Sequence, residues 1–249
     1  MKRHIALFAG IFALSSLLAA ESARADQFVY GFSGGSISGN LLNLTMQDNT
    51  FVQAPLALNP ATGSSTGFSG WYADAGFNST APNDNYIVGN LNGVNYADFL
   101  VYDLSGITRA ILAGGGVASA TEQINTFEEQ NVPALVNLWD INTDLGLLDS
   151  YPTDAQGNAI FADLSGGRTY GSHLYTDADF GQTLDINLNA NFLNDINAVV
   201  GSGGTEIGIG HSLPVTITTG VPLPSPLAAG AVLLVIIAAG RKLARRAIA

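Results

Sequence analysis

The sequence predicts an all-β fold, a jelly-roll-like β-sandwich with one short helix, flanked by an N-terminal signal peptide and a single C-terminal transmembrane helix. Three observations lead to this prediction. Short apolar runs alternate with turns rich in Gly, Asn, Thr and Ser, the pattern of antiparallel sheets. Strands and helices do not alternate, which argues against a parallel α/β fold. Both ends of the chain carry an uncharged apolar tract beside basic residues.

The N-terminus has the three parts of a secretory signal peptide. A basic start is followed by an apolar run, residues 5–20, that contains no charge. Ala23 and Ala25 then supply the small side chains that signal peptidase accepts. The alternative, a permanent membrane anchor, is disfavoured because the apolar run is short and ends in polar residues. We therefore predict export, with removal of residues 1–25 by signal peptidase and a mature chain that begins at Asp26.

The exported body, residues 26–220, is expected to be one domain of short strands, because no long linker or fixed-period repeat divides it. Residues 183–188 alternate cleanly, with Leu184 and Ile186 on the buried face and Asp185 on the exposed face. The expected strands are residues 28–32, 95–104, 134–141, 183–188, 206–210 and 214–219.

Two of these strands show a less regular pattern. In residues 95–104 the apolar side chains are interrupted by Asp98 and Asp103. In residues 134–141 a partial alternation predicts that Leu135 lies on the buried face.

A single helix is expected among the strands. In residues 191–200 apolar side chains recur at helical spacing, and Gly201 follows as a stop signal. Glycine-containing pairs predict turns at residues 92–93 and 203–204.

The C-terminus mirrors the N-terminus. An apolar segment, residues 226–240, is predicted to form a helix. Its tract after the proline, residues 227–240, would span about 21 Å at ~1.5 Å per residue, against a hydrocarbon core of about 30 Å. This length favours a temporary anchor over a permanent one. Basic residues stay on the cytoplasmic side, so the body is expected outside the inner membrane. The basic cluster comprises Arg241, Lys242, Arg245 and Arg246.

A proline motif stands directly before the apolar segment. Its residues are Val221, Pro222, Leu223, Pro224 and Ser225. The order of proline motif, apolar helix and basic cluster in residues 221–249 resembles the PEP-CTERM class of sorting signals, in the variant that reads Val-Pro-Leu-Pro-Ala. Ser225 stands where alanine is usual. The resemblance implies that an exosortase, a membrane cysteine transpeptidase, cuts near the motif and passes the body to the envelope or beyond. The alternative is a plain tail anchor preceded by a proline-rich linker.

The composition of the body excludes several function classes. The body keeps 19 acidic residues and only two basic residues, Arg109 and Arg168, a formal charge of −17. Nucleic-acid binding is excluded, because almost nothing is present to neutralise phosphates. The charge favours solubility and divalent cations. The chain contains no cysteine, so disulfides and thiolate metal sites are excluded and a hydrophobic core must hold the fold.

One polar turn is the candidate cation site. Asp140, Asn142 and Asp144 place oxygen atoms at positions 1, 3 and 5 of a calcium loop. Leu145 and Tyr151 stand where an EF-hand needs Gly and a bidentate carboxylate, so that loop type is disfavoured. No cofactor is expected, and calcium is the one candidate ion.

Two further patterns bear on other functions. Residues 31–35 fit the G-x-S-x-G pattern of a hydrolase nucleophile, with His173 or His211 as the base, but no helical pattern follows. Glycoside hydrolysis would need paired carboxylates, and no carboxylate of the body stands out as desolvated.

Aromatic residues give the other lead. Trp71, Tyr72 and Tyr86 lie in a stretch rich in Gly, Asn and Ser, and an exposed row of them would favour stacking on sugar rings.

These patterns together predict an exported, exosortase-sorted cell-envelope or extracellular-matrix protein with a structural or adhesive role and no enzymatic activity. It is tethered to the inner membrane with its body outside and is then released to the cell surface or medium. Its expected partners are signal peptidase, exosortase and exopolysaccharide. The alternatives are a carbohydrate-binding module acting on exopolysaccharide and, more remotely, a secreted hydrolase.

Overall fold

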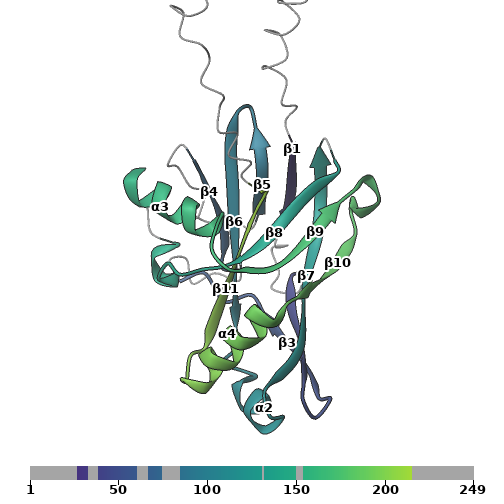
Figure 1. Cartoon of the computed structure of the whole chain (residues 1–249), viewed down its shortest axis with the longest axis vertical. Helices are drawn as coiled ribbons and strands as arrows, with labels where there is room; N and C mark the ends of the chain where they lie inside the picture. Colours follow the sequence, from purple (N-terminus) through teal and green to yellow (C-terminus); the bar gives the residue numbers. More distant parts are fainter. Residues whose placement is uncertain are drawn as a thin grey trace, which may run out of the picture. The chain divides into compact units, whose positions relative to one another are not determined.

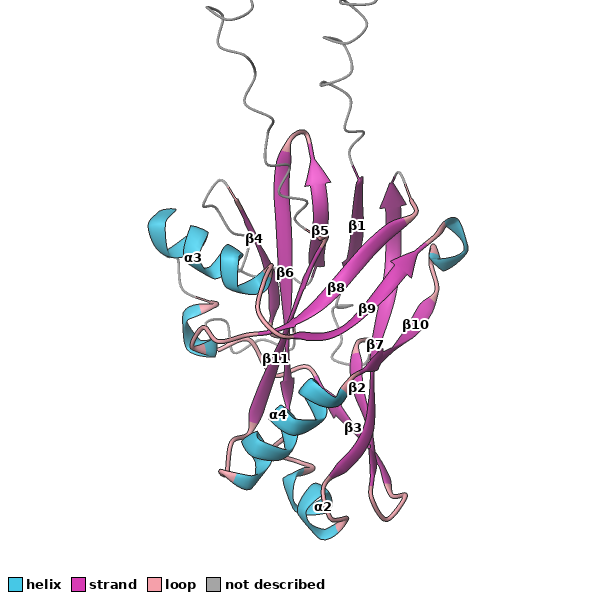
Figure 2. Ribbon diagram, in the orientation of Figure 1, coloured by secondary structure: helices cyan, strands magenta, loops and turns pink. Residues whose placement is uncertain are grey.

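Strands and short helices make up the described part of the chain, residues 27–32, 39–60, 67–74, 85–130, 132–149 and 154–214 of the computed structural model. The predicted all-β class is confirmed, as Figure 2 shows. In chain order the elements are β1 (Gln27–Phe32), β2 (Leu41–Met46), β3 (Phe51–Pro55), β4 (Ser69–Ala73), β5 (Asn85–Leu91), β6 (Val94–Asp103), α2 (Thr108–Ala113), β7 (Val117–Gln130), β8 (Ala134–Asp140), η1 (Leu145–Leu147), α3 (Asp154–Leu164), β9 (Thr169–Tyr175), η2 (Asp177–Asp179), β10 (Thr183–Leu188), α4 (Ala190–Gly201) and β11 (Glu206–Ser212).

All strand pairs are antiparallel. Nine strands form one path in the order β3-β2-β7-β1-β5-β6-β11-β8-β9, and β10 and β4 lie off this path, paired with β7 and β6 (Figure 1). The long strand β7 connects the parts of this path. Up to Asn125 it pairs with β2 and β10, and from Thr126 onward it pairs with β1. The strands β9 and β10 also approach closely. A Cβ added at Gly171 of β9 would lie only 2.7 Å from the carbonyl oxygen of Asn187 in β10. The sheet therefore curls around its own apolar side chains.

The predicted helix at residues 191–200 is confirmed as α4. Asn189 caps it, since its side chain accepts hydrogen bonds from the backbone N–H groups of Asn191 and Phe192. Phe192 and Ile196 lie one turn apart and are both fully buried. Edge-to-face packing of the Phe192 ring on Tyr170, with centroids 5.1 Å apart, fixes α4 against β9.

The expectation of a single helix was wrong, because α2 and α3 are also present. Helix α2 is six residues long, too short to show a clear apolar period. Helix α3 contains Gly157, a weak helix former, and buries its apolar residues Ile160 and Leu164 only through contact with the sheet. Tertiary packing stabilises both helices more than local propensity does.

Several local predictions are confirmed. Strand β10 has the predicted bounds, with Ile186 buried and Asp185 exposed. The turn between β5 and β6 is formed by Asn92 and Gly93, whose φ angles of 53° and 81° both lie in the left-handed region that such turns need. The predicted strand at residues 214–219 falls almost wholly outside the described residues, as do residues 1–25 and 221–249.

The face of β8 that packs into the core is the opposite of the predicted one. Leu135 is 42% exposed, whereas Val136 and Leu138 are buried. The large side chains of this strand occur on both of its faces, so the partial alternation did not decide which set of alternate residues is buried. A shift of one residue exchanges the two faces. Leu135 instead lies opposite Leu174 of β9, which is also exposed.

Strand β6 is buried on both faces, which explains its irregular pattern. Phe99 and Val101 pack into a small core beneath α3. Leu100 and Tyr102 point into the main core on the opposite side. Asp98 shares the parity of Leu100 and Tyr102, so a carboxylate enters the main core.

Close packing of α3 on β11 depends on a glycine. A Cβ at Gly210 would lie 3.1 Å from the carbonyl oxygen of Leu164 and 3.2 Å from its Cα. We expect Gly210→Ala to lower the free energy of unfolding by about 1–3 kcal/mol, because the helix must move outward. Urea denaturation measures this, with Gly106→Ala as the matched control because nothing lies within 4 Å of its Cβ position. Equal effects of the two substitutions would contradict this account of the packing.

Candidate functional site

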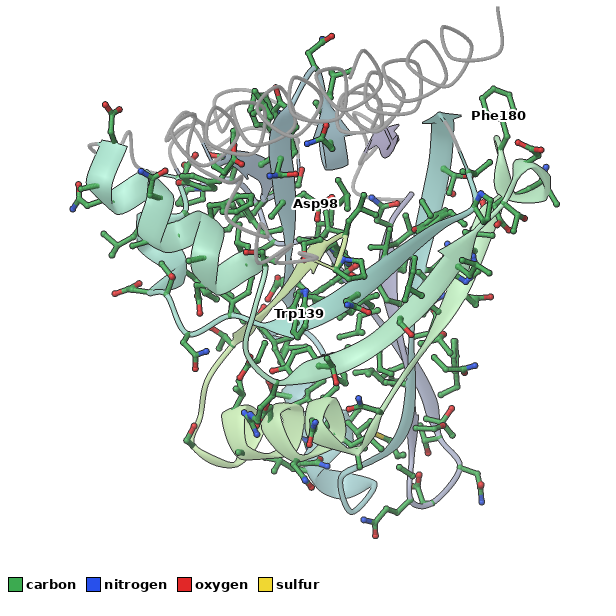
Figure 3. All side chains as sticks on the ribbon, turned by 45° about the horizontal axis from the view of Figure 1, so that its top comes forward. Asp98, Trp139 and Phe180 are labelled. Carbon is green, nitrogen blue, oxygen red and sulfur yellow. The ribbon has the colours of Figure 1, made fainter. Side chains whose placement is uncertain are left out.

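The most strongly coupled polar group of the described residues lies in the main core, around His211 of β11. His211 is the direct cross-strand partner of Asp98 on β6, which Figure 3 labels in the interior. Glu122 approaches from β7 and is held by a 2.7 Å hydrogen bond from the Tyr102 hydroxyl to its Oε1. His211 is 3% exposed, and the other three residues are fully buried.

Both imidazole nitrogens of His211 face a carboxylate. Nδ1 lies 2.5 Å from Oδ1 of Asp98, and Nε2 lies 2.8 Å from Oε2 of Glu122. A carboxylate can only accept a hydrogen bond, so each nitrogen must carry a proton. The ring is therefore an imidazolium between two carboxylates, and we call these three residues with Tyr102 the core charge cluster.

The pKa values agree with this protonation state. Burial acts to lower the pKa of His211, but attraction to Glu122 and Asp98 and hydrogen bonds to both outweigh it and raise the pKa to about 10. Burial raises the pKa of Asp98 to about 6, although attraction to His211 opposes this rise. One buried oxygen, Oδ2 of Asp98, has no hydrogen-bond partner. The cluster is accordingly held together by its central cation.

The sequence interpretation that no carboxylate is desolvated was wrong for Asp98 and Glu122. The missed signal was Asp98 itself, which interrupts the apolar side chains of this strand, since a carboxylate among buried side chains needs a buried partner. The other members could not be found by spacing, because Glu122 and His211 are 89 residues apart in the chain. Substrate has no access to this buried cluster, and its chemistry is that of a structural ion pair.

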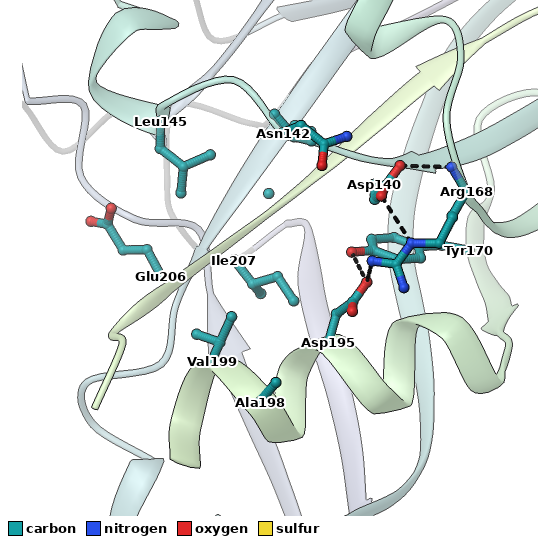
Figure 4. A pocket seen from close by; sticks show the side chains of 12 residues that line it. Asp140, Asn142, Leu145, Arg168, Tyr170, Asp195, Ala198, Val199, Glu206 and Ile207 are labelled. Carbon is teal, nitrogen blue, oxygen red and sulfur yellow. Dashed lines mark hydrogen bonds and ion pairs between the residues drawn. The ribbon is translucent and has the colours of Figure 1, made fainter. Parts of the chain in front are cut away.

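A surface pocket of about 290 Å³ lies where β8, β9, β11 and α4 meet (Figure 4). Arg168, the residue directly before β9, dominates it and contacts two carboxylates. Its Nε donates to Oδ2 of Asp140 over 3.2 Å, and its Nη2 donates to Oδ2 of Asp195 over 2.6 Å. Tyr170 also donates its hydroxyl to Oδ2 of Asp195 over 2.8 Å. The remaining lining residues are Ile141, Asn142, Leu145, Ala198, Val199, Glu206, Ile207 and Gly208.

The local backbone positions Arg168. Gly167 has a φ of +112°, and a Cβ there would lie 2.4 Å from Oδ1 of Asp140, so only glycine fits. This turn presents the backbone N–H of Arg168 to Oδ1 of Asp140 over 2.8 Å. Asp140 thus binds both the backbone and the side chain of Arg168. Hydrogen bonds to Asp195 and Asp140 and attraction to both raise the pKa of Arg168, so the guanidinium stays charged.

The residues of the candidate calcium loop are engaged in protein contacts. Asp140 binds Arg168 through both oxygens. Asn142 donates to Asp163 of α3 from its backbone and its side chain. Asp144 accepts a hydrogen bond from the N–H of Gly146 and caps η1. Within the described ranges, no group of three or more His, Cys, Asp and Glu side chains is arranged to hold a metal. Calcium binding at this turn stays a prediction.

Trp71, Tyr72 and Tyr86 do not form the exposed row that would favour stacking on sugar rings, because Tyr72 lies in the core. Tyr72 is fully buried, and its hydroxyl donates to the carbonyl oxygen of Leu148. Trp71 is half-buried and packs edge-to-face on Tyr96, with centroids 5.2 Å apart. The side chain of Tyr86 lies outside the described residues.

The remaining sequence candidates are distributed as follows. Ser33 of the G-x-S-x-G pattern lies outside the described residues, so that pattern stays untested. His173 is on β9, where its Nε2 lies 3.5 Å from Oδ2 of Asp179. Neither residue belongs to the core charge cluster. The signal-cleavage residues, the proline motif and the basic cluster also fall outside the described ranges. Among helices that the structure describes, none is long and apolar enough to cross a membrane.

Comparisons with protein-family models, with curated proteins and with solved structures found no match to the chain.

Proposed function

We propose that the chain is an exported, non-catalytic protein of the cell envelope or extracellular matrix with a structural or adhesive role. In this proposal the body is a jelly-roll-like sandwich, and the ends are a signal peptide and a sorting signal that an exosortase removes. The observation that carries the proposal is the ordered set of signals at the two ends of the sequence. Both ends place the same segment, residues 26–220, outside the inner membrane.

The body supports a role without catalysis. Two groups with strongly shifted pKa values, Asp98 and His211, are sealed in the core and bound to each other. Catalytic groups of this kind are instead expected in a cleft that substrate can enter. The strongly acidic exterior suits a protein that stays soluble among neighbouring polymers, since like charges oppose aggregation.

Processing at both ends is the prediction that tests this proposal. Mass spectrometry of the protein from an exosortase-containing host should find an N-terminal peptide that begins at Asp26 and no peptide from residues 227–249. The physical reason is that Pro222 and Pro224 keep the motif extended and outside the membrane helix, where a protease can bind it.

A variant and a control sharpen the test. Replacing Pro222, Leu223 and Pro224 with alanine should leave the full chain in the inner membrane. Replacing Pro214 with alanine, outside the motif, should leave processing unchanged. An intact tail in the wild-type protein of such a host would show a plain tail anchor and overturn the sorting proposal.

A further inference from the structure

We infer that the Arg168 pocket binds a neutral, polyhydroxylated ligand, a glycosyl unit of an uncharged polysaccharide. This inference deepens the proposed adhesive role and rests on it only for the source of the glycan. It is carried by the polar groups, the net charge and the apolar wall of a pocket that lies on the surface and is separate from the core charge cluster.

The polar groups offer both donors and acceptors. The bonds of Arg168 to Asp140 and Asp195 use two of the five N–H donors of the guanidinium. Arg168 and Tyr170 both bind Oδ2 of Asp195, and neither uses Oδ1. A sugar hydroxyl donates and accepts at once, so it can bind guanidinium and carboxylate together. A ligand with acceptors alone satisfies only the guanidinium.

The geometry of these groups is fixed before any ligand arrives. The side chain of Asp140 is 7% exposed and holds Arg168 at two points. Asp195 projects from α4, which Asn189 caps. Fixed polar groups reduce the entropy that binding must overcome. This matters for a sugar, whose hydrogen bonds replace bonds to water of nearly equal strength.

The charge of the pocket selects against ions of either sign. Asp140, Asp195 and Glu206 together oppose the single positive charge of Arg168. Burial and the charge of Asp103, its cross-strand partner, raise the pKa of Glu206. Phosphates and uronates are therefore repelled. Asp140 and Asp195 are already engaged by the guanidinium, so a cation would have to compete with Arg168 for them.

Apolar side chains form much of the remaining lining, beside Asn142 and Glu206. Ile207 of β11, Val199 of α4 and Leu145 of η1 line the side of the pocket opposite Arg168 in Figure 4. The C–H face of a pyranose ring can pack on such a wall while its hydroxyls reach the polar side. A volume of about 290 Å³ is near the lower end of the range for ligand pockets, ~300–1,000 Å³. The pocket therefore accommodates one or two sugar units.

The test is binding by the full chain, purified in a detergent without a sugar headgroup. The probes are neutral hexoses and their oligosaccharides, with glucuronate, inorganic phosphate and Ca²⁺ as ionic comparisons, measured by ligand-observed NMR and calorimetry. At least one neutral sugar should bind, and the ionic probes should not compete with it. Arg168→Gln should weaken binding by about tenfold or more, the effect of losing a charge-assisted hydrogen bond.

Two further variants keep the test decisive. Ala198→Trp fills the pocket from the exposed face of α4 and leaves the Arg168 contacts intact, so it should abolish binding while thermal stability is unchanged. Arg109→Gln removes the other arginine of the body, on α2, and should leave the affinity within about twofold.

Three results would overturn the inference: no neutral sugar binds, an ionic probe binds in its place, or Ala198→Trp binds as the wild type does. These results concern the purified chain alone. Failure of tail processing in cells would overturn the sorting proposal and leave sugar binding standing.

Discussion

Replacing His211 with leucine is expected to lower the free energy of unfolding by about 3–5 kcal/mol, or to prevent folding altogether. The substitution removes the cation that lies between Asp98 and Glu122, both of which are fully buried. Two carboxylates would then face each other in the main core without a positive charge. Total stability of a domain is about 5–15 kcal/mol, so the loss is a large fraction of it.

Equilibrium denaturation in urea measures this loss, and His173 provides the matched control. His173 also lies near a carboxylate, Asp179, but its side chain is 29% exposed. His173→Leu should therefore cost less than about 1 kcal/mol. If the two variants are equally stable, the imidazolium of His211 does not hold the core together.

The apolar residues of the core could be predicted from sequence where a strand buries only one face. Strand β10 is such a case, with Ile186 inside and Asp185 outside, and its bounds were predicted correctly. Strand β6 buries both faces, so its alternation carried no information about which residues meet. The prediction of which face of β8 is buried was wrong for a related reason. Leu135 and Leu138 are similar in hydrophobicity but lie on opposite faces of the strand.

The candidate sites could be predicted only in part. Asp140 was recognised as a residue of interest, but a calcium loop was the expected partner and Arg168 is the observed one. The pairing requires β8 and β9 to lie side by side and Gly167 to adopt a positive φ, neither of which spacing reveals. The same holds for His211, whose contact with Asp98 follows from the register of β6 and β11. Local patterns predict elements, and the register between elements creates the sites.

Alkaline pH is expected to destabilise the protein through the same cluster. The pKa of His211 is raised from 6.5 to about 10 in the folded protein, so between these values the folded state holds a proton that the unfolded state has lost. The stabilisation by His211 is therefore complete below pH 6.5, declines above it and is lost as the pH rises through about 10. One such proton gives a maximum slope of about 1.4 kcal/mol per pH unit.

Asp98 contributes in the same direction at lower pH. Its pKa is raised from 3.8 to about 6, so the folded state also binds this proton more tightly than the unfolded state does. Its contribution is largest below pH 3.8 and falls until about pH 6. From His211 and Asp98 alone, stability is highest in acid and decreases stepwise toward alkaline pH.

Urea denaturation at intervals between pH 5 and pH 10 tests this expectation, with Glu122→Gln as the diagnostic variant. Attraction to Glu122 is the largest of the effects that raise the pKa of His211, so the glutamine variant should lose stability at pH 7 and show a flatter decline above it. Titrating groups outside the cluster are common to both proteins, so the difference between the two curves isolates the cluster. His173→Gln should keep the wild-type curve, because His173 lies outside the cluster. Parallel curves for wild type and Glu122→Gln would contradict the assignment of His211 as an imidazolium held between the two carboxylates.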